Sequence, residues 1–228
     1  MSHRNVFYAR KESDCFKLSG DELHHAVNVI RIDPPSRINF TDGSGFLYEG
    51  MLMPDGTLAD VIEVESDESE IINILFGICE KSRMKIILEK CTEIGVHEFI
   101  PLITRKSSKY PLNAGRADSI LKSAIKQSGR FIKPHYREPI KLEDVHPDYC
   151  ENAYFGSIKG KNRGIEPEFS RHINIFIGPP SGFTAEEEEF LVQKGIKPFH
   201  INTAVLRTET FALSSIAIIK YLQGVKDE

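Results

Sequence analysis

The sequence predicts an α/β protein in two parts: a compact β-barrel over residues 1–69 and a mostly parallel sheet covered by helices over residues 70–228. Three observations lead to this fold class. Short runs of alternating apolar residues, separated by turn residues, fill positions 6–65, a spacing that is typical of small barrels. Beyond residue 70, apolar strands alternate with helical patterns, which favours a parallel sheet. The chain has 228 residues, of which 40% are apolar, so it can bury one large core or two smaller ones.

The first part is predicted mainly from its turns. Residues 37–53 hold two alternating runs with glycine turns between them at 42–45, which predicts a β-hairpin, and residues 55–58 form the next turn. One short helical pattern, at residues 21–31, interrupts the strands. The acidic segment 63–70 is almost free of apolar residues, so we expect it to link the two parts.

The second part alternates strands with amphipathic helices. Apolar residues recur with helical spacing from Met84 to Ile94, and Gly95 follows them as a predicted C-terminal cap. The segments predicted as strands are 71–78, 98–104, 152–157, 173–178 and 197–202. The segments predicted as helices are 82–96, 116–131, 184–195 and 208–222.

Charge is distributed unevenly along the chain. The formal net charge of −4 and the pI near 6.1 give no general indication of nucleic-acid binding. Residues 100–141, however, contain ten lysines or arginines and two acidic residues. A solvated helix face would explain this stretch, but Tyr110, Phe131 and Tyr136 interrupt it. A surface that faces phosphate groups is the favoured interpretation, and the solvated face remains open.

Other features of the chain exclude several classes of protein. The cysteines Cys15, Cys79, Cys91 and Cys150 are scattered without metal-ligand spacing, so we expect reduced thiols and no metal site. The first residues become charged at once, unlike a secretory signal. No apolar run approaches the roughly 20 residues that cross a bilayer. We therefore expect a soluble, cytoplasmic protein.

Residues 177–188 have the pattern of a strand, a Gly/Pro turn and a capped helix. Gly178 and Gly182 can adopt backbone angles closed to other residues, and Thr184 with Glu187 fits a capping box. Such loops present backbone N–H groups at the edge of a parallel sheet, where ligands usually bind. Taken alone, a turn of this kind can also be a simple connection.

A second strand-to-helix junction lies at residues 205–210. Thr208 can cap the helix there, while Arg207 stands where the helix dipole disfavours a cation. This position indicates a partner for Arg207, and two partners remain open: the carboxylate of Glu209 or an anionic ligand. Two junctions so close in sequence predict a ligand site at this edge of the sheet.

Five segments, spread over nearly the whole chain, carry a family resemblance. They are HHAVNVIR (24–31), RMKIILEKCTEIGVHEFIPL (83–102), KQSGR (126–130), IGPPSGFTAEE (177–187) and VLRTETFAL (205–213). In this order they resemble the 16S rRNA uracil-N3 methyltransferase family of the SPOUT superfamily. The resemblance implies a PUA-like RNA-binding barrel, followed by a SPOUT α/β domain with a trefoil knot. It also implies a homodimer that uses S-adenosylmethionine to methylate N3 of a uridine in 16S rRNA of the small subunit.

The chain departs from the family pattern at several positions. Where the family loop reads Gly-Pro-Glu-Gly-Gly, Pro180 replaces the acid and Ser181 replaces a glycine. Proline lacks an N–H, and serine at a positive φ would cost about 1 kcal/mol. Asn202 replaces another glycine, a milder change because asparagine tolerates the left-handed region. Arg105-Lys106 stands for Glu-Arg, and lysine loses the bidentate fork of arginine. These changes bear on donor affinity and substrate choice.

Methyl transfer to a uracil nitrogen is an in-line displacement. The protein must therefore align donor and base and stabilise the anion left when the N3 proton is lost. Cations near the base favour its deprotonated form, which makes Arg207, Arg130 and Lys106 the candidate catalytic residues. We name no general base: His25 and His97 could serve, but a lone histidine is more often structural or an RNA contact.

Two further groups of candidate residues follow from the motifs and the resemblance. The candidate donor-binding residues are Phe155, Gly178, Pro179, Ser181, Gly182, Phe183, Ile201, Asn202, Val205, Leu206 and Thr208. The candidate RNA-binding residues are His25, Arg31, Arg105, Lys109, Lys126 and Arg130. Neutral backbone groups of the loops suit an adenine, whereas the cations suit phosphate.

The leading hypothesis is a dimeric, S-adenosylmethionine-dependent rRNA methyltransferase. A rival from another class is an RNA-binding or ribosome-assembly protein that keeps the fold and has lost efficient donor binding. The substitutions at positions 180, 181 and 202 motivate this rival. Methylation of a different RNA or base also remains open, since the barrel and the basic stretch do not specify a sequence.

Overall fold

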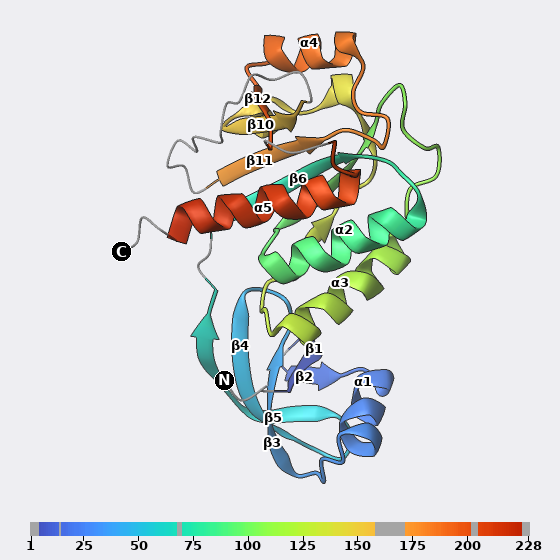
Figure 1. Cartoon of the computed structure of the whole chain (residues 1–228). Coiled ribbons are helices and arrows are strands. Elements are labelled where there is room, and N and C mark those ends of the chain that lie inside the picture. The colour runs from blue at the N-terminus through green and yellow to red at the C-terminus, as the bar shows by residue number, and fades with distance from the viewer. Residues whose placement is uncertain (1–4, 14, 68–69, 158–171, 202–204, 225–228) are drawn as a thin grey trace. The chain divides into compact units, whose positions relative to one another are not determined.

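A computed structural model describes residues 5–13, 15–67, 70–157, 172–201 and 205–224 (Figure 1). The chain forms two compact units. The first unit comprises residues 1–69 and 121–133, and the second comprises residues 70–120 and 134–228. The predicted α/β class, with a barrel and a parallel sheet, is confirmed.

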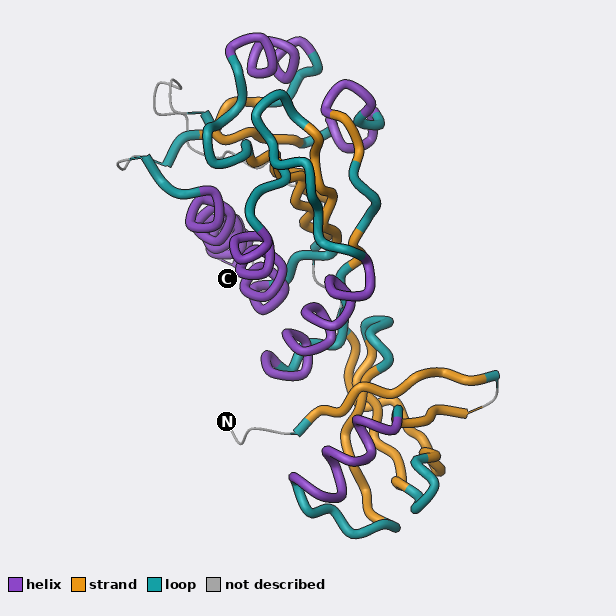
Figure 2. The backbone as a smooth tube through the Cα atoms, turned by 90° about the vertical axis from the view of Figure 1, so that its right-hand side faces the viewer, coloured by secondary structure: helices purple, strands orange, loops and turns teal. Residues whose placement is uncertain are grey.

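The first unit is a closed barrel with the strand order β1-β2-β5-β4-β3, visible as the curled strands in Figure 2. The strands are β1 (Val6–Glu12), β2 (Cys15–Leu18), β3 (Ser36–Thr41), β4 (Phe46–Leu52) and β5 (Thr57–Ser66). β1 and β3 close the barrel as a parallel pair, and the other pairs are antiparallel. Alternate side chains point inward, so that Ala9, Phe40 and Leu52 are fully buried in its core. The β3–β4 pair is the predicted hairpin.

The predicted helical insert is a short helix continued by a π-helical turn. α1 (Gly20–His24) is capped by Ser19, whose Oγ accepts the N–H of Glu22 at 3.4 Å, and η1 (His25–Val29) follows it. After η1, Arg31 has a φ of +64°, which a residue with a Cβ rarely adopts. π-helical turns and left-handed non-glycine residues are both concentrated at functional sites. This segment is therefore a candidate for a role in binding.

The predicted linker is partly strand. β5 continues through Ser66, and its last residues pair with β4, from Tyr48 opposite Glu63 to Phe46 opposite Ser66. The linker prediction is therefore wrong for residues 63–66. Pairing there uses backbone groups only, and the side chains of residues 63–66 are exposed, so no apolar pattern marks the strand. Residues 68–69 lie outside the described part of the chain.

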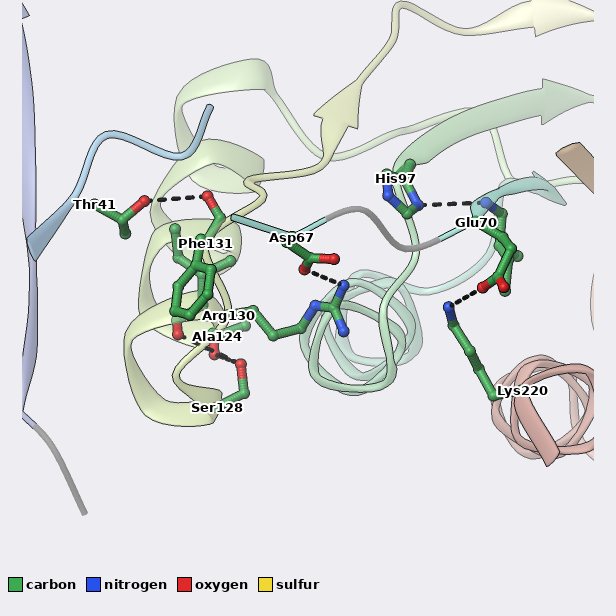
Figure 3. A network of polar contacts seen from close by, with 11 residues as sticks. Thr41, Asp67, Glu70, His97, Ala124, Ser128, Arg130, Phe131 and Lys220 are labelled. Atoms are coloured by element: carbon green, nitrogen blue, oxygen red, sulfur yellow. Dashed lines mark hydrogen bonds and ion pairs between the residues drawn. The ribbon is translucent and has the colours of Figure 1, made fainter. Parts of the chain in front are cut away.

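A segment distant in sequence completes the first unit. The part of α3 (Ala114–Ser128) from residue 121 onward belongs to this unit. Residues 129–133 then lie beside the turn between β3 and β4, where Ile132 forms a β-bridge with Ser44. The carbonyl of Phe131 accepts two hydrogen bonds, from Thr41 Oγ1 at 3.1 Å and from the N–H of Gly45 at 3.1 Å. Figure 3 shows the first of these bonds. Residues 121–133 were predicted to belong to the second part, 70–228, whereas they cluster with the first unit.

The second unit contains a seven-stranded sheet in the order β12-β10-β11-β6-β7-β8, with β9 also paired to β7. The strands are β6 (Ile71–Gly77), β7 (Glu98–Ile103), β8 (His135–Tyr136), β9 (Ile140–Lys141), β10 (Ala153–Gly156), β11 (His172–Ile177) and β12 (Lys197–Phe199). Each of these pairings is parallel. The five predicted strands are present, whereas the two-residue strands β8 and β9 were not predicted.

Helices pack against this sheet. They are α2 (Lys81–Ile94), α4 (Ala185–Gln193), α5 (Thr208–Gly224) and the short 3-10 turns η2 (Leu142–Asp144) and η3 (Pro147–Cys150). α2 and α5 lie side by side, α5 also contacts β11, and α4 packs beside β12 (Figure 1). α2 ends at Gly95 with a φ of 113°, and α4 begins with the capping box of Thr184 and Glu187. Both predicted caps are confirmed.

The core of the second unit is assembled from strands and helices together. Leu75, Ile100, Phe155, Phe176 and Leu191 are all buried in it. Among the described residues, no helix has both the length and the apolar character that a bilayer span requires.

Candidate functional site

Three parallel strands and one helix meet at a cavity in the second unit. β11 ends at Ile177, β10 at Gly156 and β12 at Phe199, while α5 begins at Thr208. The cavity has a volume of about 230 Å³. It is lined by Gly156, Ser157, Ile177, Gly178, Pro179, Pro180, Ser181, Gly182, His200, Ile201, Val205, Leu206, Thr208 and Phe211. It lies at the carboxyl ends of parallel strands, where ligands of α/β proteins usually bind.

The structure brings most of the predicted donor-binding residues together. Those that line the cavity are Gly178, Pro179, Ser181, Gly182, Ile201, Val205, Leu206 and Thr208. Phe155 and Phe183 do not line it: they are buried, and their ring centroids lie 6.4 Å apart in an edge-to-face contact. Asn202 lies outside the described residues. The two predicted loops therefore form one site, with the two phenylalanines in the adjoining core.

Close backbone packing shapes the cavity. A Cβ atom at Gly77 would lie 2.5 Å from the nitrogen of Pro179, and one at Gly156 would lie 2.7 Å from the ring of Phe211. Such approaches are too short for any side chain, so both positions require glycine. The absence of these side chains lets the loop and the aromatic ring pack directly on the strand ends.

The loop after β11 is a tight turn that accommodates the two unusual residues. The N–H of Gly182 donates to the carbonyl of Pro179 at 2.7 Å, which defines a β-turn over 179–182. Pro180 occupies the second position of this turn, which proline favours. The positive φ, +69°, falls on Gly182, and Ser181 does not have one. The strain expected for Ser181 is therefore absent.

The loop after β7 is tied to the wall of the cavity. Lys106 Nζ donates to the carbonyl of Ser181 at 3.3 Å. Glu187, which is 8% exposed, accepts from the N–H of Arg105 and from the N–H of Thr184, both at 2.8 Å. Glu187 therefore does more than cap α4, because its second oxygen holds the loop that carries Lys106.

Arg207 stands at the N-terminus of α5. Its carbonyl accepts from the N–H of Phe211 at 2.8 Å, so Arg207, and not Thr208 as predicted, is the N-cap residue. Glu209 pairs with Arg83, with 3.3 Å between Oε2 and Nη1. Arg207 is exposed and has no ion-pair partner within the part of the chain that the structure describes. The sequence left two partners open for Arg207, the carboxylate of Glu209 or an anionic ligand. Glu209 pairs with Arg83 instead.

His200 is a lining residue that sequence reasoning missed. Its Nδ1 lies 3.1 Å from the carbonyl of Ser157. A carbonyl only accepts, so Nδ1 carries the proton and Nε2 of the neutral ring is an acceptor. The sequence carried no signal for it, because the predicted strand 197–202 runs through His200, whereas β12 ends at Phe199. Phe211 is the other large lining residue that was not predicted, because its place in the apolar pattern of α5 made it look like an ordinary core residue.

Two predicted RNA-binding cations form ion pairs in the first unit. Lys126 Nζ lies 2.8 Å from Glu22 Oε2. Arg130 Nη2 lies 2.9 Å from Asp67 Oδ2, a pair that Figure 3 shows. Arg130 thus belongs to the first unit, whereas the other two candidate catalytic cations belong to the second. The structure does not bring the three cations together within one unit.

The other predicted RNA-binding residues are exposed. His25 and Arg31 lie on the surface of the first unit, and Lys109 lies on the surface of the second. Arg105 pairs with Glu186 at 3.4 Å, and both side chains are 66% exposed. Such a pair is weak in water, so the Arg105 guanidinium can exchange this partner for a phosphate.

His97, considered as a general base, has a structural position. The backbone N–H of His97 donates to the carbonyl of Ile72 at 2.8 Å, and the ring Nδ1 of His97 accepts from the backbone N–H of Ile72 at 3.3 Å. These bonds join the start of β7 to β6. Because Nδ1 accepts the N–H of Ile72, this ring nitrogen is not available to accept a proton from a substrate.

Comparison with known proteins identifies the family. The profile described as RNA methyltransferase domain matches residues 66–220, more than half of the chain. The chain belongs to this family. The family resemblance found in the sequence and the prediction of an RNA methyltransferase are thus confirmed.

Several relatives of this RNA methyltransferase cover most of its length. Ribosomal RNA small subunit methyltransferase E of Bacillus subtilis is 28% identical, over 92% of this chain and 91% of its own. Ribosomal RNA small subunit methyltransferase E 2 of Borreliella burgdorferi is 28% identical, over 87% and 88%. The crystal structure of ribosomal RNA small subunit methyltransferase E from Neisseria gonorrhoeae, bound to S-adenosyl methionine, aligns with a TM-score of 0.79 at 25% identity. That alignment covers 96% of this chain and 98% of the other.

Proposed function

We propose that this RNA methyltransferase transfers a methyl group from S-adenosylmethionine to N3 of a uridine in 16S rRNA of the small ribosomal subunit. The cavity at the ends of β10, β11 and β12 carries the proposal, because its lining residues Leu206 and Thr208 flank Arg207, the exposed cation. Relatives named as small-subunit rRNA methyltransferases support the substrate, and the donor-bound relative supports the cofactor. N3 of uridine is the position implied by the sequence resemblance.

The residues of the cavity fit this donor. Residues 178–182 carry no side chain larger than proline or serine, so peptide groups form that wall. A Cβ at Gly182 would meet nothing within 4 Å, which leaves open space beside this backbone. Ile177, Leu206 and Phe211 supply apolar surface. Peptide edges with apolar surface suit an adenine and its ribose. We assign donor binding to these two loops.

The side chains around the cavity would favour the reactive form of the base. When bound, the donor supplies a methyl group on a sulfonium, which is open to in-line attack. Arg207 and Lys106 place positive charge near the target, and nearby cations lower the free energy of a deprotonated N3. Lys106 already contacts the cavity wall at Ser181. Arg130 is the corresponding candidate from the first unit.

The proposal includes finer features that the resemblance implies. The barrel is a PUA-like RNA-binding module, the second unit contains a trefoil knot, and the enzyme acts as a homodimer in the cytoplasm. Exposed His25, Arg31 and Lys109 support contact with RNA. Light scattering coupled to size-exclusion chromatography tests the dimer: twice the chain mass of 25.8 kDa is expected.

An RNA-binding protein with weakened catalysis is the second candidate. The substitutions Pro180 and Ser181 favour it, but the turn over 179–182 accommodates both residues. We therefore expect the double variant Pro180→Glu/Ser181→Gly to bind the donor about as tightly as the native chain. A large gain in donor affinity would instead support the weakened protein.

Calorimetric titration with S-adenosylmethionine, followed by methyl transfer to unmodified small subunits, tests the main proposal. We expect micromolar binding and methylation of uridine. Arg207→Ala should lower kcat about a hundredfold, whereas Lys85→Ala, which removes an exposed cation of α2, should leave kcat unchanged. No detectable binding at millimolar donor would refute the enzyme function.

A further inference from the structure

The first unit contains a second cavity, of about 870 Å³, that donor binding does not use. It is enclosed by β1, by the segment of α1 and η1, and by the chain from Ser123 to Phe131. All of its lining residues belong to the first unit. Its properties can therefore be derived from this unit alone.

A buried carboxylate forms part of the cavity wall. Glu22 is 7% exposed, and both of its oxygens are engaged. Oε1 accepts from the N–H of Tyr8 at 3.1 Å, and Oε2 accepts from Lys126 Nζ at 2.8 Å. The ion pair neutralises Lys126, the one lysine among the described lining residues, so Lys126 is already satisfied without an external phosphate.

The charge of the cavity disfavours an anionic ligand. Besides Glu22, Glu65 also lines it, and Lys126 is the only lysine or arginine among the lining residues that the structure describes. Two acidic residues and one lysine leave this described lining negative. A phosphate would be repelled there, since like charges in a partly desolvated site interact unfavourably. The ligand that fits is uncharged and presents hydrogen-bond donors.

Neutral polar and aromatic groups line the rest. Asn5 and Gln127 supply amide groups, and Ser123 supplies a hydroxyl. The ring of His25 meets that of Phe7 edge-on, with centroids 6.4 Å apart. Amide groups that read a base edge, next to an aromatic ring on which a base can stack, are the means by which proteins recognise unpaired nucleotides. The irregular backbone of η1 presents His25 to this cavity.

We propose that this cavity binds one unpaired nucleobase of the substrate RNA, and that it prefers guanine. The proposal rests on the proposed function, which makes RNA the substrate. Guanine carries two adjacent donors, N1–H and the N2 amino group, and a carboxylate such as that of Glu65 accepts both together. The cations elsewhere on the unit can hold the phosphates, while this cavity selects the base.

Fluorescence anisotropy with the full-length protein tests this assignment. The probes are a labelled oligouridine with one central guanosine and the same RNA with adenosine at that position. We expect the adenosine RNA to bind about tenfold more weakly, because adenine lacks the adjacent N1–H and N2 amino donors that Glu65 would accept. Ser123→Phe, which fills the cavity, and Gln127→Ala should both reduce this difference.

Gln193→Ala is the matched control, because Gln193 is an exposed glutamine of α4 in the second unit. It should keep the full tenfold preference. Equal binding of the two RNAs by the native protein, or a preference that persists in Ser123→Phe, would overturn the assignment. Donor binding and methyl transfer are measured in the same preparations. If both are intact while the preference is absent, the inference fails alone; if both are absent, the proposed function fails as well.

Discussion

Replacing Glu187 by alanine tests how the donor cavity is held together. The Glu187 carboxylate accepts two backbone N–H groups at 2.8 Å, from Arg105 and from Thr184, and it is 8% exposed. Hydrogen bonds to a charged group contribute about 1.5–3 kcal/mol each, and alanine leaves both donors without this acceptor. After allowance for water that reaches the exposed side of the site, we expect Glu187→Ala to lower the free energy of unfolding by about 3 kcal/mol.

The neighbouring Glu189→Ala is the control. Glu189 belongs to the same acidic run but is exposed, and among the described residues its side chain accepts one hydrogen bond, from Gln193 Nε2 at 3.5 Å. Its loss should cost less than about 0.5 kcal/mol. Urea unfolding followed by circular dichroism compares the two, and calorimetry should show weaker donor binding for Glu187→Ala alone. If the two variants unfold at the same urea concentration, the reasoning about Glu187 is refuted.

Three further predictions concern the same unit. Gly156→Ala places a Cβ 2.7 Å from an aromatic ring of the cavity, so titration should show about tenfold weaker donor binding. Gly20→Ala, whose Cβ meets nothing within 4 Å, should bind normally, and equal affinities would contradict the packing argument. Burial raises the pKa of Cys79 from 9.0 to about 12. The unfolded thiol then ionises first, and the free energy of unfolding should fall as the pH rises from about 9 towards 12; a rise in the urea midpoint over that range would have the wrong sign. Arg83→Ala frees the carboxylate of Glu209 to attract Arg207, so kcat/KM for methyl transfer should fall about fivefold. The double variant Arg83→Ala/Glu209→Gln should recover part of this loss, and no recovery would show that the pair acts by packing alone.

Local patterns predicted most of the fold. Helical spacing before Gly95 and the capping box of Thr184 and Glu187 appear in the structure as predicted. These signals work because they depend on residues within one or two turns of each other. The cavity loops were also found from sequence, because two strand-to-helix junctions lie close together in the chain and ligands usually bind at that edge of a parallel sheet.

Contacts between segments distant in sequence could not be predicted from local patterns. Thr41 and Phe131 are 90 positions apart, and neither residue type signals the hydrogen bond that joins them. The end of β5 is exposed and polar, so backbone pairing alone makes it a strand. His200 lines the cavity because the short β12 ends just before it. A sequence pattern does not report where a strand of three residues stops.

The pairing of Glu209 determines what Arg207 can do. Two residues apart at the start of one helix, the two charges would attract each other if both were free. Arg83 Nη1 instead holds Glu209 at 3.3 Å, and their side chains are 25% and 12% exposed, so this pair is less screened than a surface one. Arg207 then remains charged, exposed and without an intramolecular ion pair among the described residues. A cation at a helix N-terminus is disfavoured by the helix dipole. An anion in the adjoining cavity removes that penalty, and a deprotonated uracil is such an anion. Under the proposed function, the Arg83–Glu209 pair between α2 and α5 thus leaves Arg207 to respond to the reacting base.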